Sequence, residues 1–144
     1  MEKKYDFFLA GVIQGSHVEK LVHEQDYREQ LKEILTTHAP GRIVYCPVEN
    51  HRGSVEYSDA EAHEVFFGHL DIIRASRVMI AFLPTASMGT AVEMEICRQE
   101  NIPVVAITPL RHNWVVRLYS RAVLPDLAAF ADWLTPANLA ALGV

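Results

Sequence analysis

The chain has 144 residues, which is enough for one domain with a buried core. Half of its residues are hydrophobic and 22% are charged, and its formal net charge of −5 at pH 7 argues against nonspecific binding to nucleic acid. No apolar run approaches the ~20 residues that cross a bilayer, and the opening residues lack the pattern of a signal peptide, so we expect a cytoplasmic protein without a membrane partner.

The first third of the chain predicts two strands with a long helix between them. Residues 6–13 (DFFLAGVI) form a continuous apolar run, which is typical of a strand covered on both faces of a parallel sheet. Ser16 and Glu19 have the spacing of a capping box, so we expect a helix that begins there and ends near Pro40. Residues 42–48 (RIVYCPV) then predict the second strand.

The middle of the chain repeats the alternation of helix and strand. Residues 49–59 read as a polar loop, and the capping-box spacing recurs at Ser58 and Glu61. A helix is therefore expected over 59–75. Residues 77–83 (RVMIAFL) predict the third and most apolar strand.

The last part of the chain predicts one more strand. A helix is expected to run to about Glu100, and residues 102–109 (IPVVAITP) predict the fourth strand. The segments that follow predict only a short helix with a turn and two further short helices, at 111–123, 126–134 and 136–143.

Strands that alternate with helices predict the fold class. Such a chain forms right-handed crossovers, which give a parallel sheet with helices on both faces. We therefore expect one doubly wound α/β domain over residues 1–144, flavodoxin-like or Rossmann-like. These sheets bind ligands beyond the carboxyl ends of their strands, at the point where strand order reverses. The loops at 10–16, 47–54 and 84–90 are the ones expected at this edge.

The loop at 10–16 (AGVIQGS) places Gly11, Gly15 and Ser16 between a strand and a helix N-terminus. Backbone N–H groups and the helix dipole favour an anion at such a position. The loop lacks both a GxGxxG fingerprint and a Walker lysine. A tight turn followed by a serine cap is the simpler interpretation, and it stays open.

The loop at 84–90 (PTASMGT) leads into the next helix. The hydroxyl of Ser87 could donate to a phosphate oxygen, and Gly89 would let the backbone come close to a ligand. Glu93 has two interpretations. It forms a third capping box with Thr90, or it is a catalytic carboxylate beside a bound phosphate compound.

The two cysteines give no sign of a metal site. Cys46 ends one apolar strand and Cys97 lies on the apolar side of a helix, without ligand spacing between them. We predict two buried reduced thiols, and neither a metal ion nor a cofactor.

Two segments together resemble the nucleoside 2-deoxyribosyltransferase superfamily. The first is FFLAGVIQGS, and the second is VMIAFLPTASMGTAVEMEIC followed by IPVVAI. The resemblance covers roughly residues 6–107 in order and spacing. It is nearest to the branch of nucleoside 5′-monophosphate N-glycosidases, the deoxynucleotide and cytidylate hydrolases.

The resemblance implies roles for several residues. Glu93 aligns with the family's catalytic glutamate, and Ser87 with a position that is serine in nucleotide enzymes and often aspartate in nucleoside enzymes. A neutral donor tolerates a phosphate dianion, so Ser87 points to a 5′-monophosphate ligand. Ser120 falls where the family supplies a phosphate ligand from a neighbouring subunit, which implies a homodimer. The other expected substrate-binding positions are Phe8, Gly11, Ile13, Gly15, Ser16 and Gly89.

The sequence departs from the family at two positions. The family often has tyrosine where this chain has Phe8. The loss of the tyrosine hydroxyl leaves space near C2′ of the sugar, which favours ribonucleotides as substrates. The family also has an aspartate on the helix before the third strand, and here the candidates are His69 and Asp71. Two residues turn a helix by ~200°, so only one of them can face the ligand.

The expected activity is hydrolysis of the N-glycosidic bond of a (deoxy)ribonucleoside 5′-monophosphate to free base and sugar 5-phosphate. The carboxylate of Glu93 would stabilise or attack C1′ as the base departs. A nucleoside deoxyribosyltransferase and a nucleotide-binding module without catalysis are the alternatives. Arg111, His112 and Trp114, after the fourth strand, are possible contacts to the ligand; Trp114 is also expected at a dimer interface with Val115 and Val116.

Overall fold

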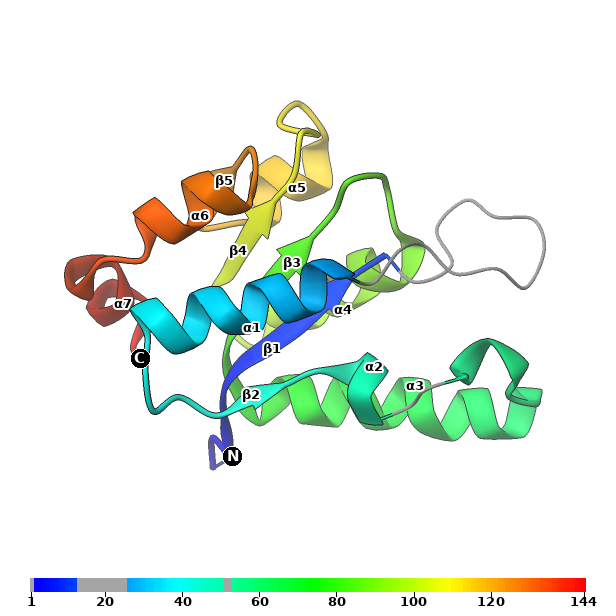
Figure 1. Ribbon diagram of the computed structural model, residues 1–144. Coiled ribbons are helices and arrows are strands. Elements are labelled where there is room, and N and C mark those ends of the chain that lie inside the picture. The colour runs from blue at the N-terminus through cyan, green and yellow to red at the C-terminus, as the bar shows by residue number, and fades with distance from the viewer. Residues whose placement is uncertain (1, 13–25, 51–52) are drawn as a thin grey trace.

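The computed structural model describes residues 2–12, 26–50 and 53–144. Its centre is a sheet of five strands that are all parallel, in the order β2-β1-β3-β4-β5 (Figure 1). The strands are β1 (Tyr5–Gly11), β2 (Val44–Tyr45), β3 (Ser76–Phe82), β4 (Val104–Ile107) and β5 (Ala122–Leu124). The predicted α/β fold is confirmed, and the strand order is the flavodoxin-like one.

Helices cover both faces of the sheet (Figure 1). One face packs against α1 (Asp26–His38), α6 (Leu127–Trp133) and α7 (Pro136–Leu142), and the other against α3 (Asp59–Arg74), α4 (Met88–Gln99) and α5 (Trp114–Tyr119). The side chains of β1 alternate between the faces, so that Phe7 and Leu9 join the first core while Phe8 and Ala10 join the second. Both faces are apolar, which explains the continuous hydrophobic run of this strand.

The strand order reverses between β1 and β3. From β1 the chain passes to β2 on one side and then returns to β3 on the other. The two central strands end level with each other, because Gly11 pairs with Phe82 in the parallel register. The loops that follow β1 and β3 therefore start side by side at the carboxyl edge, as expected for a ligand site.

Several predicted elements are confirmed. Ser58 caps α3, and its side chain and that of Glu61 form the reciprocal bonds of a capping box. Cys46 and Cys97 are both free and buried. The predicted capping box of Ser16 and Glu19 lies outside the described residues. None of the helices in the described ranges is long and apolar enough to span a membrane.

The sequence prediction missed β5 and overestimated β2. β5 begins at the end of the segment predicted as a helix and a turn, residues 111–123. Its three residues are too few to give a periodic pattern in the sequence. Backbone hydrogen bonds hold the strand against β4: the N–H of Arg121 donates to the Val104 carbonyl (2.7 Å), and the N–H of Thr108 donates to the Leu124 carbonyl (2.8 Å). β2 is short because Pro47 begins a helix, α2 (Pro47–Asn50), and proline favours the first helical position. A 3₁₀-helix, η1 (Ser54–Glu56), interrupts the predicted polar loop.

Candidate active site

A cavity of about 560 Å³ opens at the carboxyl edge of the sheet, beside the end of β1. Its wall comes from β1, α1, Pro47 of α2, η1 with the following Tyr57, α3 and the start of α4. Its lining includes Gly11, Arg28, Phe66, His69, Ser87 and Glu93. The cavity thus lies where the reversal of strand order predicts a ligand site.

The first turn of α4 determines how Glu93 is interpreted. The N-cap is Ser87, whose Oγ accepts a hydrogen bond from the N–H of Thr90 at 3.2 Å. Thr90 is therefore the third residue of the helix and not its cap, so the predicted capping box of Thr90 and Glu93 is wrong. Glu93 lies one turn further along, where it is not needed for capping, and its side chain lines the cavity.

The carboxyl of Glu93 has an unusual environment. Burial raises its pKa from 4.5 to about 7, against the opposing effect of the Arg28 guanidinium. A carboxyl that titrates near neutral pH in a cavity is typical of functional sites, because such a group can change its charge during a reaction.

Arg28 is the positively charged residue of the described wall, and the sequence analysis missed it. Its side chain is only 3% exposed. Nη1 donates to the carbonyl oxygen of Leu9 at 3.2 Å and lies 3.8 Å from Cys46 Sγ, and the guanidinium is 5.0 Å from the centre of the Tyr27 ring. The charge is thus fixed against β1 and the end of β2.

A signal for Arg28 does exist in the sequence. It precedes Leu31 by three residues and Leu35 by seven, and both leucines are buried in the core. Arg28 therefore lies on the apolar face of α1. An arginine at such a position is either at the edge of the core or in a functional site, and the surrounding charged residues of this helix hide the pattern.

The N-terminus of α4 offers several hydrogen-bond donors. Ser87, Gly89 and Thr90 all line the cavity. The Thr90 hydroxyl is buried and has no hydrogen-bond partner among the described residues. A β-carbon at Gly89 would meet only a ring carbon of Phe66 at 4.0 Å, so this glycine is not required by packing within the protein. Such a helix start favours an anionic group.

Gly11, in contrast, is required by packing. A β-carbon at this position would overlap the Tyr27 hydroxyl and lie 2.9 Å from the Phe82 carbonyl oxygen. The buried Tyr27 hydroxyl occupies this space without a hydrogen-bond partner among the described residues. Close approach of α1 to the end of β1 therefore depends on glycine.

Replacing Gly11 by alanine should lower the free energy of unfolding by about 1–3 kcal/mol, because the overlap with backbone cannot be relieved by a rotamer change. The matched control is Gly68→Ala in the middle of α3, where an added β-carbon meets nothing within 4 Å. This control should raise the free energy of unfolding by about 0.5–1 kcal/mol. Urea denaturation of both variants tests the expectation, and a shift of the same sign in both would contradict it.

Of the two candidates on α3, His69 faces the cavity and Asp71 does not. The His69 ring lines the cavity and lies edge-on to Phe8 (6.3 Å between ring centres) and to Tyr45 (5.9 Å). The Asp71 side chain is 72% exposed and accepts a hydrogen bond from Arg74 at 2.8 Å. Asp71 thus faces solvent, and a direct catalytic role for it is inconsistent with this position.

Phe8 does not reach the cavity. It is fully buried and stacks on Tyr45 at 5.6 Å between ring centres, on the side of the sheet that carries His69. Leu9 and Ala10 line the cavity instead. The prediction that Phe8 contacts a ligand is therefore corrected: it supports the position of His69.

The remaining predicted residues are not brought into this cavity. Ile13, Gly15 and Ser16 lie outside the described residues. Ser120 follows α5, and its neighbour Arg121 bonds to Val104 at the amino end of β4, so Ser120 lies at the opposite edge of the sheet from the cavity of its own chain. The contribution of Ser120 to a second copy stays a prediction.

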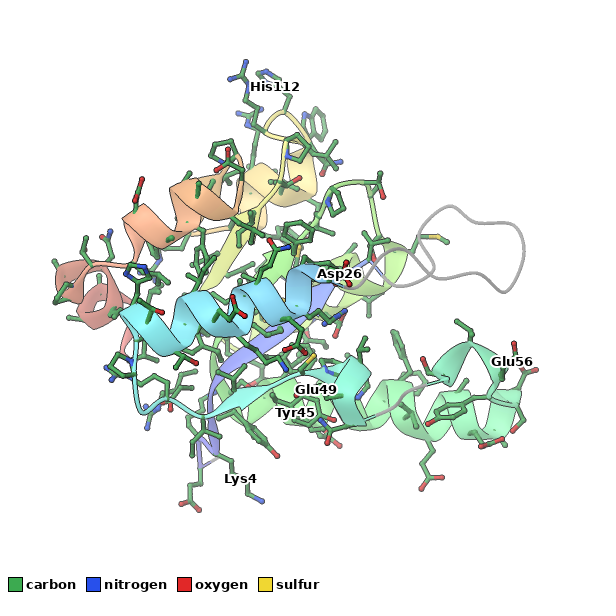
Figure 2. All side chains as sticks on the ribbon, in the orientation of Figure 1. Lys4, Asp26, Tyr45, Glu49, Glu56 and His112 are labelled. Carbon is green, nitrogen blue, oxygen red and sulfur yellow. The ribbon has the colours of Figure 1, made fainter. Side chains whose placement is uncertain are left out.

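The loop after β4 also lies apart from the cavity. Arg111 and His112 are exposed and do not line it, and Figure 2 shows His112 at the tip of its loop, directed away from the sheet. An apolar wall that the sequence analysis missed comes from Pro47, Val55, Tyr57 and Phe66. The prediction of a plain polar loop hid Val55 and Tyr57, which α2 and η1 bring against α3.

Comparisons with known proteins give a fold relationship. No protein-family profile and no curated protein matches the chain. Among solved structures, a 2-deoxyribosyltransferase from the psychrotolerant bacterium Bacillus psychrosaccharolyticus, described as a biocatalyst for the synthesis of antiviral and antitumoral nucleosides, is similar with a TM-score of 0.69 and 19% identity over 93% of this chain and 95% of that one. A conserved protein from Enterococcus faecalis V583 has a TM-score of 0.65 and 19% identity over 93% of this chain and 98% of its own. At this identity the comparisons show a shared fold.

Proposed function

We propose that this protein hydrolyses the N-glycosidic bond of a nucleoside 5′-monophosphate, giving free base and sugar 5-phosphate. The observation that carries the proposal is the carboxyl of Glu93, which lines the cavity half-buried, has a pKa of about 7 and lies one turn from a helix N-terminus that favours anions. The fold shared with a 2-deoxyribosyltransferase supports it, because that enzyme's name describes transfer of a deoxyribosyl group. The order and spacing of the two sequence motifs support it as well.

The reaction assigns Glu93 the central role. Breaking the bond between C1′ and the base leaves positive charge on the sugar, which an adjacent carboxylate stabilises or captures as a covalent glycosyl ester. Water then attacks C1′, releases the carboxylate and completes the sugar 5-phosphate. The departing base takes up a proton, and the ring of His69 in the same wall is the candidate donor. Because the carboxylate form is the reactive one, the rate should rise as pH increases through about 7.

The phosphate group is assigned to the start of α4. The Ser87 and Thr90 hydroxyls and the N–H groups of this turn line the cavity, and none of them carries a negative charge. The apolar wall with Tyr57 and Phe66 suits the flat face of a base. A nucleoside monophosphate has both parts, joined by the sugar that must lie beside Glu93.

Replacing Ser87 by aspartate tests the assignment of the phosphate. Aspartate is also a favoured N-cap, so α4 should still begin at the same residue. Its charge should repel a phosphate dianion and reduce kcat/KM for the monophosphate by about 100-fold, with less than about a tenfold effect on the matching nucleoside. Steady-state kinetics on both substrates measures the ratio. Equal losses on the two substrates would contradict the assignment, and Ser87→Asn is the neutral control that keeps the cap.

The proposed activity is tested with a panel of ribo- and deoxyribonucleoside 5′-monophosphates and the corresponding nucleosides, with chromatography of the released base. Release of base with equal formation of sugar 5-phosphate supports the hydrolase. Addition of a second free base tests the alternative of a transferase, which would form a new nucleoside or nucleotide. Binding of a monophosphate without release of base would overturn the proposal in favour of a non-catalytic module.

A homodimer is proposed together with this function. The helices α3, α4 and α5, which cover one face of the sheet, expose large apolar side chains to solvent. A second copy of the chain would cover these side chains. They are Phe67, Met88, Val92, Trp114 and Leu118. The expected contribution of Val116 is wrong, because this side chain is buried in the core of its own chain.

A further inference from the structure

Arg28 is the only lysine or arginine among the described residues that line the cavity. It is almost fully buried, and it belongs to α1, whereas Glu93 and the unpartnered Thr90 hydroxyl belong to α4, which Ser87 caps. A buried guanidinium is costly unless anionic groups or hydrogen-bond acceptors compensate its charge. Packing alone therefore does not explain why Arg28 lies in this wall.

We infer that Arg28 is a positioning residue whose anchored positive charge, in the same cavity wall as Glu93, favours the reactive carboxylate form of that side chain. The inference rests on the proposed function for the part that concerns reaction, but the effect of Arg28 on the charge of Glu93 does not depend on any substrate. Nothing in the two sequence motifs pointed to Arg28, which lies between them.

The geometry holds the guanidinium in place. Nη1 is tied to the Leu9 carbonyl at 3.2 Å, and the group lies against Cys46 Sγ and over the Tyr27 ring. Leu9 lines the same cavity as Glu93. Because the charge is fixed by the strands and not by a flexible surface contact, it provides a permanent field at the carboxyl edge.

Other titratable groups face Glu93 but give no fixed positive charge. On α1, burial raises the pKa of Tyr27 to about 12, and on α4 it raises the pKa of Cys97 to about 12, so both stay neutral over the working range. From α3, His69 lines the cavity and Asp59 lies exposed in the first turn of the helix. Arg28 is thus the one described group in this wall that favours the carboxylate at every pH of interest.

The opposing effects on Glu93 determine what removal of Arg28 does. Burial favours the neutral acid and Arg28 favours the carboxylate, and the pKa of about 7 is the balance of the two. Without the guanidinium only the effect of burial is left. The carboxyl would then be mostly protonated at neutral pH and could not stabilise a positive charge.

The test uses Arg28→Gln, which keeps a donor for the Leu9 carbonyl while removing the charge, and Arg28→Lys, which keeps the charge. The measurement is the titration of the Glu93 carboxyl by NMR in protein labelled with ¹³C at the glutamate carboxyl, with Glu93→Gln to identify the signal. We expect the midpoint to rise by about one pH unit or more in Arg28→Gln and to return to within about half a unit of the parent in Arg28→Lys. The acidic limb of the kcat/KM profile for a nucleoside 5′-monophosphate should move by the same amount.

The matched control is Lys32→Met, which removes one positive charge from the same helix one turn further on. Lys32 contacts Glu29 and Glu49 at the surface and does not line the cavity. Its removal should leave the midpoint of Glu93 unchanged. Folding of each variant is checked by circular dichroism, and Arg28→Met serves if Arg28→Gln does not fold.

The outcomes separate this inference from the proposed function. An unchanged midpoint in Arg28→Gln would overturn the role of Arg28, whatever the activity, and so would a failure of both uncharged variants to fold, which would show a structural role. A raised midpoint in a protein that releases no base would support the role of Arg28 and overturn the proposed function instead.

Discussion

Replacing Glu93 by alanine should reduce release of base from a nucleoside 5′-monophosphate by at least about 1,000-fold. The Glu93 carboxyl lines the cavity, has a pKa of about 7 and has no capping role in its helix. Without it, the positive charge at C1′ loses the carboxylate that would stabilise or capture it. Single-turnover kinetics with a radiolabelled base measures the bond-breaking step itself.

The control for this loss lies two residues further along α4. Glu95 is on the outer side of the helix, where its oxygens pair with Arg98 at 2.7 Å, and Glu95→Gln should retain the activity of the parent protein. Glu93→Gln should resemble Glu93→Ala, because the amide keeps the shape but cannot carry the charge. Substantial release of base by Glu93→Ala would exclude the mechanism.

The second large effect expected on replacing Glu93 is on stability, which should increase although activity is lost. Glu93→Gln should raise the free energy of unfolding at pH 8 to 9 by up to about 3 kcal/mol. In the folded protein the carboxyl has a pKa of about 7, against 4.5 for its usual value, so ionisation costs more in the folded state than in the unfolded one. The cost is complete above pH 7, decreases as pH falls, and is absent below about pH 4.5, where both states are protonated.

Urea denaturation of the parent protein and of Glu93→Gln at pH 8.5 and at pH 4 checks this expectation. The two curves should separate at the higher pH and approach each other at the lower one. A parent protein that is the more stable of the two at pH 8.5 would show that Glu93 is a structural carboxylate. Loss of activity together with a gain in stability is the combination expected of a group kept for chemistry.

The sequence predicted the fold where apolar runs are long. The strands β1, β3 and β4 have continuous hydrophobic segments. The start of the helix α3 was predicted from the capping-box residues Ser58 and Glu61. The edge strands β2 and β5 were predicted less well, because two or three residues give no period and their existence depends on pairing with a neighbour.

The candidate site was predicted in part. Ser87, His69 and Glu93 lie in one wall because strand order brings their elements together, which the alternation of strands and helices already implies. The orientation of Phe8 could not be predicted, because in a strand that is apolar on both sides nothing distinguishes one face from the other. Arg28 was missed because the charged residues around it on α1 hide the spacing that places it with Leu31 and Leu35 on the apolar face.

The hydrogen bond at the start of α4 determines which chemical partners that corner can accept. The bond from Thr90 N–H occupies a lone pair of Ser87 Oγ, while the hydroxyl hydrogen is left to point toward an incoming molecule. A group that only accepts, such as a phosphoryl or carboxylate oxygen, finds a proton there without disturbing the helix. An ammonium or an amide N–H could use only the second lone pair of this oxygen, and it would leave the hydroxyl hydrogen without an acceptor. The hydroxyl of Ser87 thus favours ligand atoms that accept hydrogen bonds, whatever the net charge of the ligand.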